Sequence, residues 1–202
     1  MKLYYSPGAC SLSPHIALHE AGIAFEAVLA STKTHKLLDG TDYYGINPLG
    51  YVPLLELDDG TLLREGPAIV QYIADQAPLK NLAPANGTLA RYRLQEWLTF
   101  IGTELHKGFS PLFNPAMPED AKAISRTRLM SRYTWLEKEL AGKDFVMGEH
   151  FSVADGYLFT VTNWAKALKL DLAGFPTVLA WHDRVGSRPA VQAALKAESA
   201  TR

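Results

Sequence analysis

Cys10 is the only thiol of this 202-residue chain, and its neighbours favour a reactive role. It follows the Pro7-Gly8 turn and stands at the start of a stretch with helical spacing. Free N–H groups and the helix dipole at such a position favour a thiolate over a thiol. The alternative is a buried, inert cysteine, because free cysteine is among the most buried residue types. A single cysteine also excludes an internal disulfide, so any redox chemistry needs an external thiol.

Val52-Pro53 immediately precedes an apolar, strand-like run. X-Pro bonds adopt the cis form often enough for this bond to be a candidate. In that form we expect Val52 to expose its N–H and C=O, which then pair with an extended peptide ligand as with an added strand. The alternative is a trans proline that only marks the start of the strand.

Glu65-Gly66-Pro67 combines a carboxylate with the start of a helix. The carboxylate suits a ligand ammonium, and the first free N–H groups of the helix suit a ligand carboxylate. Together these groups predict a site for a zwitterion. The alternative is that Glu65 is a solvated residue beside a favourable dipole.

The overall composition excludes several classes of protein. Lys and Arg number 20 against 21 Asp and Glu, so the chain lacks the basic surplus of nucleic-acid-binding proteins. No apolar stretch approaches the roughly 18 to 20 residues that cross a bilayer. The first dozen residues contain Ser6, Pro7 and Gly8, where a secretory signal would be apolar. We therefore expect a cytoplasmic globular protein that binds neither nucleic acid nor membrane and holds no metal.

Residues 1–77 predict a small mixed α/β domain. The expected elements are a strand at 2–6, a helix from about 12 to 22, a strand at 25–29, at most an irregular helix within 31–46, strands at 54–57 and 61–63, and a helix from 66 to about 77. Asp58-Asp59-Gly60 suits a hairpin turn in which Gly60 takes a positive φ. This order of elements fits a thioredoxin-like sheet covered by helices.

Residues 78–88 have the composition of a linker, and residues 89–202 predict an all-helical second domain. The expected helices span 89–107, 118–140, 153–168, 176–185 and 189–197. Ser152 and Asp155 have the spacing of a capping box, which we assign to folding.

Three segments carry a resemblance to a known family: residues 5–12 (YSPGACSL), 65–72 (EGPAIVQY) and 104–107 (ELHK). Together with the thioredoxin-like half and the helical half, they resemble the glutathione S-transferases, and most closely the bacterial beta class, over essentially the whole chain. The resemblance implies a cytoplasmic detoxification enzyme that works as a homodimer with glutathione as co-substrate.

Glutathione is γ-Glu-Cys-Gly, and the resemblance implies where its parts bind. The zwitterionic γ-glutamyl end meets Glu65 and the Gly66 N–H, and the cysteinyl backbone pairs with Val52 ahead of Pro53. The sulfur then lies near Cys10.

Further contacts are also implied by the resemblance. His35 stands where related sequences usually have Lys and would meet the glycyl carboxylate, with Lys36 as the neighbouring candidate. Thr99 and Thr103 match positions where the family often has Asn and Ser that reach glutathione, in part from the partner subunit, and Lys107 joins this group.

His106 is placed by the resemblance close to Cys10, where it would hold a thiolate or relay a proton. The alternative is a histidine that favours the C-terminal end of its own helix. Four aromatic side chains of the helical half could form an apolar wall for the electrophile: Phe109, Phe113, Tyr157 and Trp164. Trp164 matches a family position near the pocket, although a helical tryptophan is often part of the core.

Our hypothesis is a glutathione transferase that conjugates the glutathione thiolate to electrophiles, with side activity in disulfide exchange, peroxide reduction or dehalogenation. Cys10 favours a share of exchange, and Tyr5 and Ser11 are fallback activators. One rival function is a monothiol, glutaredoxin-like oxidoreductase, because the sequence after Cys10 has no second cysteine. The other rival is a non-catalytic binder of apolar ligands.

Overall fold

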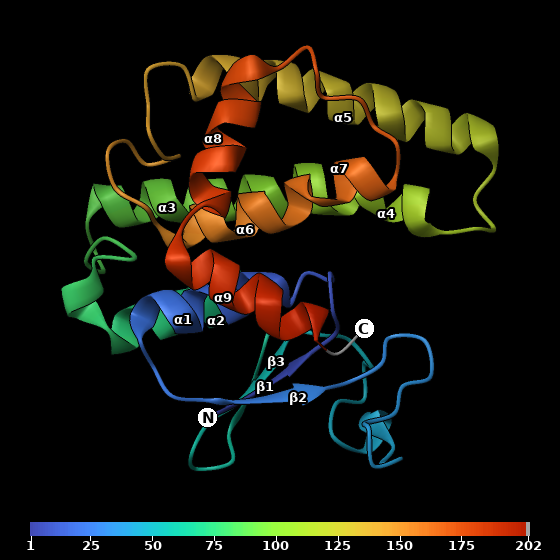
Figure 1. The fold of residues 1–202 in the computed structure, drawn as a ribbon, viewed down its shortest axis with the longest axis vertical. Helices are drawn as coiled ribbons and strands as arrows, with labels where there is room; N and C mark the ends of the chain where they lie inside the picture. The colour runs from blue at the N-terminus through green and yellow to red at the C-terminus, as the bar shows by residue number, and fades with distance from the viewer. Residues whose placement is uncertain (201–202) are drawn as a thin grey trace. The chain divides into compact units, whose positions relative to one another are not determined.

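The computed structural model describes residues 1–200, which form two compact units (Figure 1). Unit 1 is Met1–Ala83 together with the C-terminal segment that begins at Arg188, and unit 2 is Pro84–Ser187. The division after Ala83 falls inside the predicted linker. Within residues 1–200, no helix has both the length and the apolar character needed to cross a membrane.

Unit 1 is built on a four-stranded sheet in the order β2-β1-β3-β4. β1 (Lys2–Tyr5) pairs in parallel with β2 (Glu26–Leu29) and antiparallel with β3 (Leu54–Glu56), which pairs antiparallel with β4 (Leu62–Arg64). Gly60, in the turn of the hairpin, has a φ of 84°, which glycine adopts without strain. The predicted thioredoxin-like arrangement is confirmed.

One face of this sheet is covered by helices (Figure 1). α1 (Leu12–Ala21) packs against α2 (Gly66–Gln76), and the short η2 (Pro78–Lys80) follows. The apolar side chains of this layer, among them Leu3, Leu55, Ile16 and Ile69, are fully buried. Their burial is the main source of stability for the unit.

The other face of the sheet is covered by residues 31–51. Tyr4 and Leu54 of the sheet form a buried cluster with Tyr43 and Val52. The regular structure within this segment is η1 (Tyr43–Gly45), a short 3₁₀ turn capped by Asp42, whose carboxylate accepts the Tyr44 N–H at 3.0 Å. This agrees with the expectation of at most an irregular helix.

The last helix, α9 (Pro189–Ser199), belongs to unit 1 and lies along α1 (Figure 1). The sequence predicts one helical domain over residues 89–202, whereas in the structure this last helix packs in unit 1. Arg188 Nε and Nη2 contact the two carboxylate oxygens of Glu20 at 2.6 and 2.8 Å, and Val191 and Ala194 are fully buried. Sequence periodicity shows that a helix has a buried stripe but not which layer that stripe contacts.

Unit 2 is helical, as predicted. Its first predicted helix, 89–107, continues without a break to 113 as α3, η3 and α4, and η3 is π-helical. Its predicted helix at 153–168 is divided at Asn163 into α6 and α7. The elements are α3 (Leu89–Phe100), η3 (Ile101–His106), α4 (Lys107–Phe113), α5 (Glu119–Glu139), α6 (Val153–Thr162), α7 (Trp164–Ala167) and α8 (Pro176–Gly186).

Asp155 is fully buried at the start of α6 and accepts four hydrogen bonds. The Ser152 N–H and hydroxyl donate to it at 2.9 and 3.0 Å, the Val146 N–H at 2.8 Å and the Trp181 indole N–H at 3.0 Å. Burial raises the pKa of this carboxyl group, and the four hydrogen bonds act in the opposite direction. The predicted capping box is therefore also a junction between α6, α8 and the preceding loop.

Replacement of Asp155 by Ala should lower the free energy of unfolding by about 3 kcal/mol, because it leaves four buried donors without an acceptor. Urea unfolding followed by tryptophan fluorescence measures the change. Asp171→Ala is the control, because the exposed Asp171 accepts a single local bond from Ala173 N at 2.9 Å. Equal losses in the two variants would contradict a special role for Asp155.

Candidate functional site

Cys10 lies two residues before α1, as the sequence predicts. Its side chain is half-buried, and its Sγ donates a hydrogen bond to the carbonyl oxygen of Val52 at 3.2 Å. Its own carbonyl accepts the Ser13 N–H at 3.2 Å, so the residue is already part of the first helical turn. The structure therefore brings together Cys10 and Val52, two of the residues that the sequence analysis assigned to one site.

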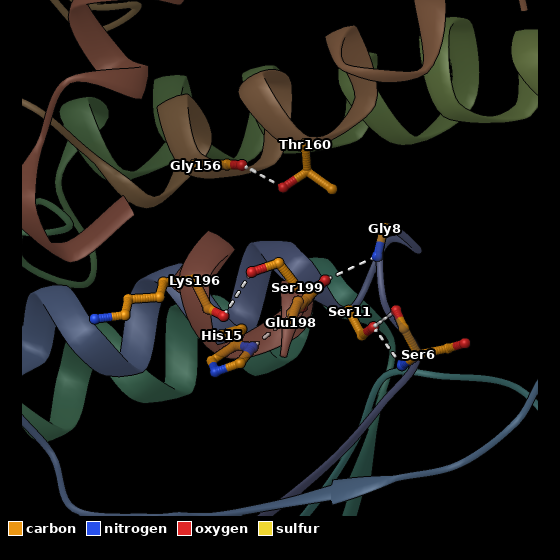
Figure 2. Close-up of polar contacts among 9 residues, drawn as sticks. All are labelled: Ser6, Gly8, Ser11, His15, Gly156, Thr160, Lys196, Glu198 and Ser199. Carbon is orange, nitrogen blue, oxygen red and sulfur yellow. Dashed lines mark hydrogen bonds and ion pairs between the residues drawn. The ribbon is translucent and has the colours of Figure 1, made fainter. Parts of the chain in front are cut away.

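Ser11 and Tyr5, the fallback activators, are buried and make contacts within the protein. The Ser11 hydroxyl is fully buried, accepts the Ser6 N–H at 3.1 Å and donates to the Ser6 carbonyl at 3.2 Å (Figure 2). Tyr5 is also buried, and its ring packs on His15 with 5.4 Å between ring centroids. Neither hydroxyl has the exposure of the Cys10 thiol, which favours Cys10 as the reactive group.

The segment before β3 is held by a group of polar side chains. The Tyr51 carbonyl accepts the Tyr43 hydroxyl at 2.9 Å and the Asn47 side-chain amide at 2.8 Å, and Arg64 Nε donates to Asn47 Oδ1 at 3.0 Å. Burial raises the pKa of Tyr43 to about 12, so its hydroxyl stays a donor at neutral pH. The sequence does not predict this clamp, because Tyr43 and Asn47 lie in a segment without a periodic pattern and Arg64 comes from β4.

The bond between Val52 and Pro53 is cis. Within residues 1–200, the Val52 N–H has no hydrogen-bond partner, while its carbonyl accepts from Cys10. An extended peptide placed here would find a backbone donor ready and an acceptor shared with a thiol.

Glu65 precedes α2 and has a φ of 68° and a ψ of 112°. Such a positive φ strains any residue other than glycine, typically by 1–3 kcal/mol. The Glu65 carbonyl accepts the Ala68 and Ile69 N–H groups at 3.0 and 2.9 Å, while its side chain is exposed and caps nothing. The carboxylate is thus presented to solvent at the amino end of a helix, as the zwitterion site requires.

His35 and Lys36 differ in how they are held. The His35 ring stacks on Tyr44 with 4.5 Å between centroids, and its Nδ1 is buried without a hydrogen-bond partner in the described chain. A Cβ at Gly50 would lie 2.6 Å from Tyr44 Cε1 and 2.9 Å from His35 Nδ1, so this packing requires glycine. His35 therefore has only Nε2 left for a ligand, whereas the Lys36 side chain is exposed.

In unit 2, His106 ends the π-helical stretch and is oriented by Tyr157. Its Nδ1 lies 2.7 Å from the Tyr157 hydroxyl, and its ring packs on Trp164 with 4.9 Å between centroids. Burial, assisted by the neighbouring charge of Lys107, lowers the pKa of His106 to about 4. The imidazole is therefore neutral at physiological pH, which favours a hydrogen-bonding role over a cationic one.

The threonines assigned to the site lie on exposed positions of this helix. Thr99 Oγ1 donates to the Gln95 carbonyl at 2.8 Å, and Thr103 Oγ1 donates to the Thr99 carbonyl at 3.0 Å. Both hydroxyls already donate a hydrogen bond within the helix, so they can only accept one from a ligand. Lys107 is also exposed.

Among the four aromatic candidates, Phe109 and Phe113 pack against Trp164, and Tyr157 packs against His106, but the four differ in exposure. Phe109, Tyr157 and Trp164 are at most 8% exposed, whereas Phe113 is 50% exposed and packs edge-on against Trp164 at 5.3 Å. Phe109 is fully buried, which is typical of a core residue. Phe113 has the most surface to offer a ligand.

Glu198 was not singled out from the sequence, yet it binds the turn that carries Cys10. Its carboxylate accepts the Gly8 N–H at 2.8 Å and contacts His15 Nδ1 at 3.1 Å (Figure 2). The available signal was its spacing: Val191, Ala194 and Glu198 share one face of α9, so a carboxylate stands in an apolar stripe. Among residues 1–200, no cluster of His, Cys and acidic side chains is arranged to hold a metal.

Comparison with known proteins matches both units. The model of the glutathione S-transferase N-terminal domain matches residues 8–76, and that of the C-terminal domain matches residues 100–189. A glutathione S-transferase of Escherichia coli O157:H7 is 47% identical over 198 residues, with 98% of each chain covered.

Solved structures of glutathione S-transferases are also similar to this chain. A sphingomonad glutathione S-transferase complexed with glutathione has a TM-score of 0.95 at 50% identity, covering 98% of this chain and 99% of that one. A bacterial beta class enzyme of Sphingomonas chungbukensis has a TM-score of 0.95 at 49% identity, covering 98% of each chain. This chain belongs to the glutathione S-transferase family.

Proposed function

We propose that the protein binds glutathione in unit 1 and transfers its thiolate to an electrophilic substrate. The observation that carries the proposal is the contact between Cys10 Sγ and the Val52 carbonyl beside the unpartnered Val52 N–H. A peptide that pairs with Val52 has its cysteinyl sulfur next to the Cys10 thiol. Glutathione is such a peptide, and the sphingomonad relative is known in complex with it.

The ends of the tripeptide are matched by charge. We assign the γ-glutamyl ammonium to the exposed Glu65 carboxylate and the γ-glutamyl carboxylate to the N–H groups that begin α2 at Gly66. The glycyl carboxylate is assigned to His35 Nε2 and to the Lys36 ammonium. Thr99, Thr103 and Lys107 are assigned to the same ligand from unit 2.

Conjugation requires a thiolate at neutral pH. The N–H groups at the start of α1 stabilise a negative sulfur, and the thiol proton leaves to solvent. With an aryl chloride, the glutathione sulfur forms the C–S bond, the C–Cl bond breaks and chloride departs. Phe113, with its exposed ring beside Trp164, is the proposed apolar contact for such a substrate.

Cys10 also supports thiol-disulfide exchange as a second activity. Its thiolate attacks the glutathione sulfur of a mixed disulfide, which forms a Cys10–glutathione disulfide and releases the other thiolate. A second glutathione thiolate then attacks that bond, which yields glutathione disulfide and regenerates Cys10. No second cysteine is needed for this monothiol route.

We propose a neutral His106 as a hydrogen-bond donor to the reacting sulfur. The proposal assigns the imidazole proton to Nε2, so that Nδ1, 2.7 Å from the Tyr157 hydroxyl, accepts the hydroxyl proton. A pKa of about 4 also makes His106 a weak base, so proton relay is the less favoured of its two predicted roles.

We further propose that the protein is a beta class homodimer with a role in detoxification. The class and the dimer follow from the resemblance of residues 5–12 and 65–72 to beta class sequences. The cytoplasm is the proposed location, because glutathione keeps a lone thiol such as Cys10 reduced there.

The test is turnover with glutathione on a panel of aryl chlorides, peroxides and mixed disulfides. Turnover of aryl chlorides supports a transferase, and turnover of mixed disulfides alone supports a glutaredoxin-like oxidoreductase. Tight glutathione binding without any turnover would favour the non-catalytic binder.

Glu65→Ala should weaken glutathione binding by about 2 to 3 kcal/mol, because the ligand ammonium, buried in the complex, is then left unpaired. Glu65→Gly should weaken binding equally but raise the free energy of unfolding by about 1 kcal/mol, because glycine relieves the positive φ. Titration calorimetry and urea unfolding measure the two effects. Glu26→Ala, which removes an exposed carboxylate from β2, is the control, and an unchanged dissociation constant in Glu65→Ala would remove Glu65 from the site.

Cys10→Ala should abolish disulfide exchange while conjugation is only reduced, since exchange forms a covalent bond to Cys10 and conjugation does not. Steady-state rates on a mixed disulfide and on an aryl chloride give the comparison, with glutathione affinity measured in parallel. A proportional loss of both activities at unchanged affinity would contradict separate roles for the sulfur.

Acidification should destabilise the protein through His106. The folded-state pKa of about 4 is below the usual value of 6.5, so the unfolded state binds the extra proton between these values and stability falls as pH falls. The contribution lost between pH 7 and pH 5 is about 1 to 2 kcal/mol. Urea unfolding of the wild type and of His106→Gln at both pH values isolates the His106 contribution. An equal decrease in the free energy of unfolding of both proteins would argue against that contribution.

A further inference from the structure

Glu198 is a buried carboxylate near the end of α9, and its side chain is 3% exposed. It lies between two groups of unit 1, the Gly8 N–H at 2.8 Å and His15 Nδ1 at 3.1 Å (Figure 2). A carboxylate is seldom buried without partners, because desolvation is costly. Both of its oxygens are engaged here, so the arrangement is specific.

The two groups that Glu198 contacts flank Cys10 along the chain. Gly8, with a φ of 75°, is in the turn two residues before Cys10, and His15 is in the second turn of α1. Within the turn, Ala9 N and Ser11 Oγ donate to the Ser6 carbonyl, which are local hydrogen bonds. Glu198 instead ties the turn to a helix more than 180 residues away in sequence.

His15 is itself held on all sides. It is 1% exposed, and its ring is 5.3 to 5.4 Å from the rings of Tyr5, His19 and Phe25, measured between centroids. Because His15 is held in the core, its contact with Glu198 fixes the carboxylate, which in turn fixes the Gly8 N–H.

α9 is anchored at its other end by a separate contact. Arg188 forms its two-point ion pair with Glu20 at the end of α1, far along the helix from Gly8. One end of α9 is held by Arg188, and the turn before Cys10 is held by Glu198. Substitutions at these two residues can therefore test the two contacts separately.

We propose that Glu198 is a positioning residue for Cys10. By accepting the Gly8 N–H it fixes the turn at 6–10, so that the Cys10 thiol stays at the Val52 carbonyl where the glutathione sulfur is expected. The inference rests on the proposed function and adds the C-terminal helix to the glutathione-binding unit. Loss of the contact should lower kcat, because small misplacements of reacting groups slow reactions strongly.

The experiment compares Glu198→Ala, Glu198→Gln and Arg188→Ala in the full-length protein. Glu198→Ala should lower kcat for a mixed disulfide by about tenfold to a hundredfold. KM for glutathione should stay within about threefold, because Glu65 and Val52 are untouched. Glu198→Gln keeps an acceptor for the Gly8 N–H and should restore most of kcat. Arg188→Ala should lower the thermal midpoint but leave kcat near the wild-type value.

Amide hydrogen exchange of the peptide that contains Gly8 supplies a readout independent of turnover. Protection should fall in Glu198→Ala and persist in Glu198→Gln and Arg188→Ala. An equal loss of kcat in Arg188→Ala and Glu198→Ala would overturn the proposal, since docking of α9 would then explain the effect. A Glu198→Gln protein that keeps Gly8 protection but not kcat would overturn it too.

If the wild type turns over none of the panel substrates, the proposed function fails. The inference is then decided by the rate at which iodoacetamide alkylates Cys10, the only thiol of the chain. A rate changed in Glu198→Ala and unchanged in Arg188→Ala supports it, and identical rates in Glu198→Ala and the wild type overturn it.

Discussion

The hydrogen bond between Cys10 Sγ and the Val52 carbonyl joins two loops more than 40 residues apart, and the site in unit 1 depends on it. Each loop is held by its own polar anchors. Asn47 and Tyr43 bind the Tyr51 carbonyl on one side, and Ser11 and Glu198 bind the turn at 6–10 on the other. These anchors are buried, so their hydrogen bonds compete with little water and hold the loops without regular secondary structure. A thiol and a free backbone N–H are thereby kept at one place.

Three carboxylates show how environment divides one chemical group among different roles. Asp155 is fully buried with four donors, and its role is structural. Glu198 is nearly as buried but accepts a backbone N–H in the turn that precedes Cys10. Glu65 is exposed, caps nothing and is held on a strained backbone. Of the three, only Glu65 has an exposed carboxylate that caps no helix, and this makes it suitable for binding a ligand cation.

The sequence predicted the parts of the fold that depend on local patterns. The hairpin at Asp58-Asp59-Gly60, the start of α2 at Gly66 and the capping box at Ser152 depend on turn and cap residues within a few positions. Cys10 at the start of α1 was predicted for the same reason. The placement of α9 was not predicted, because helical periodicity says nothing about the layer that the buried stripe of Val191 and Ala194 contacts. Glu198 and the clamp of Asn47 and Arg64 were missed because their partners are distant in sequence.

The neutral state of His106 limits the role that we propose for it. An imidazolium would stabilise a negative sulfur by charge, but burial beside Trp164 and the charge of Lys107 both oppose protonation. The contact between Nδ1 and the Tyr157 hydroxyl orients the ring, which suits the directed hydrogen bond that we propose for His106. Lys107, the next residue along the chain, carries a positive charge and is exposed. In the mechanism that we propose, the N–H groups at the start of α1 supply the positive potential for the sulfur, and their alignment on it depends on how firmly the turn before Cys10 is held.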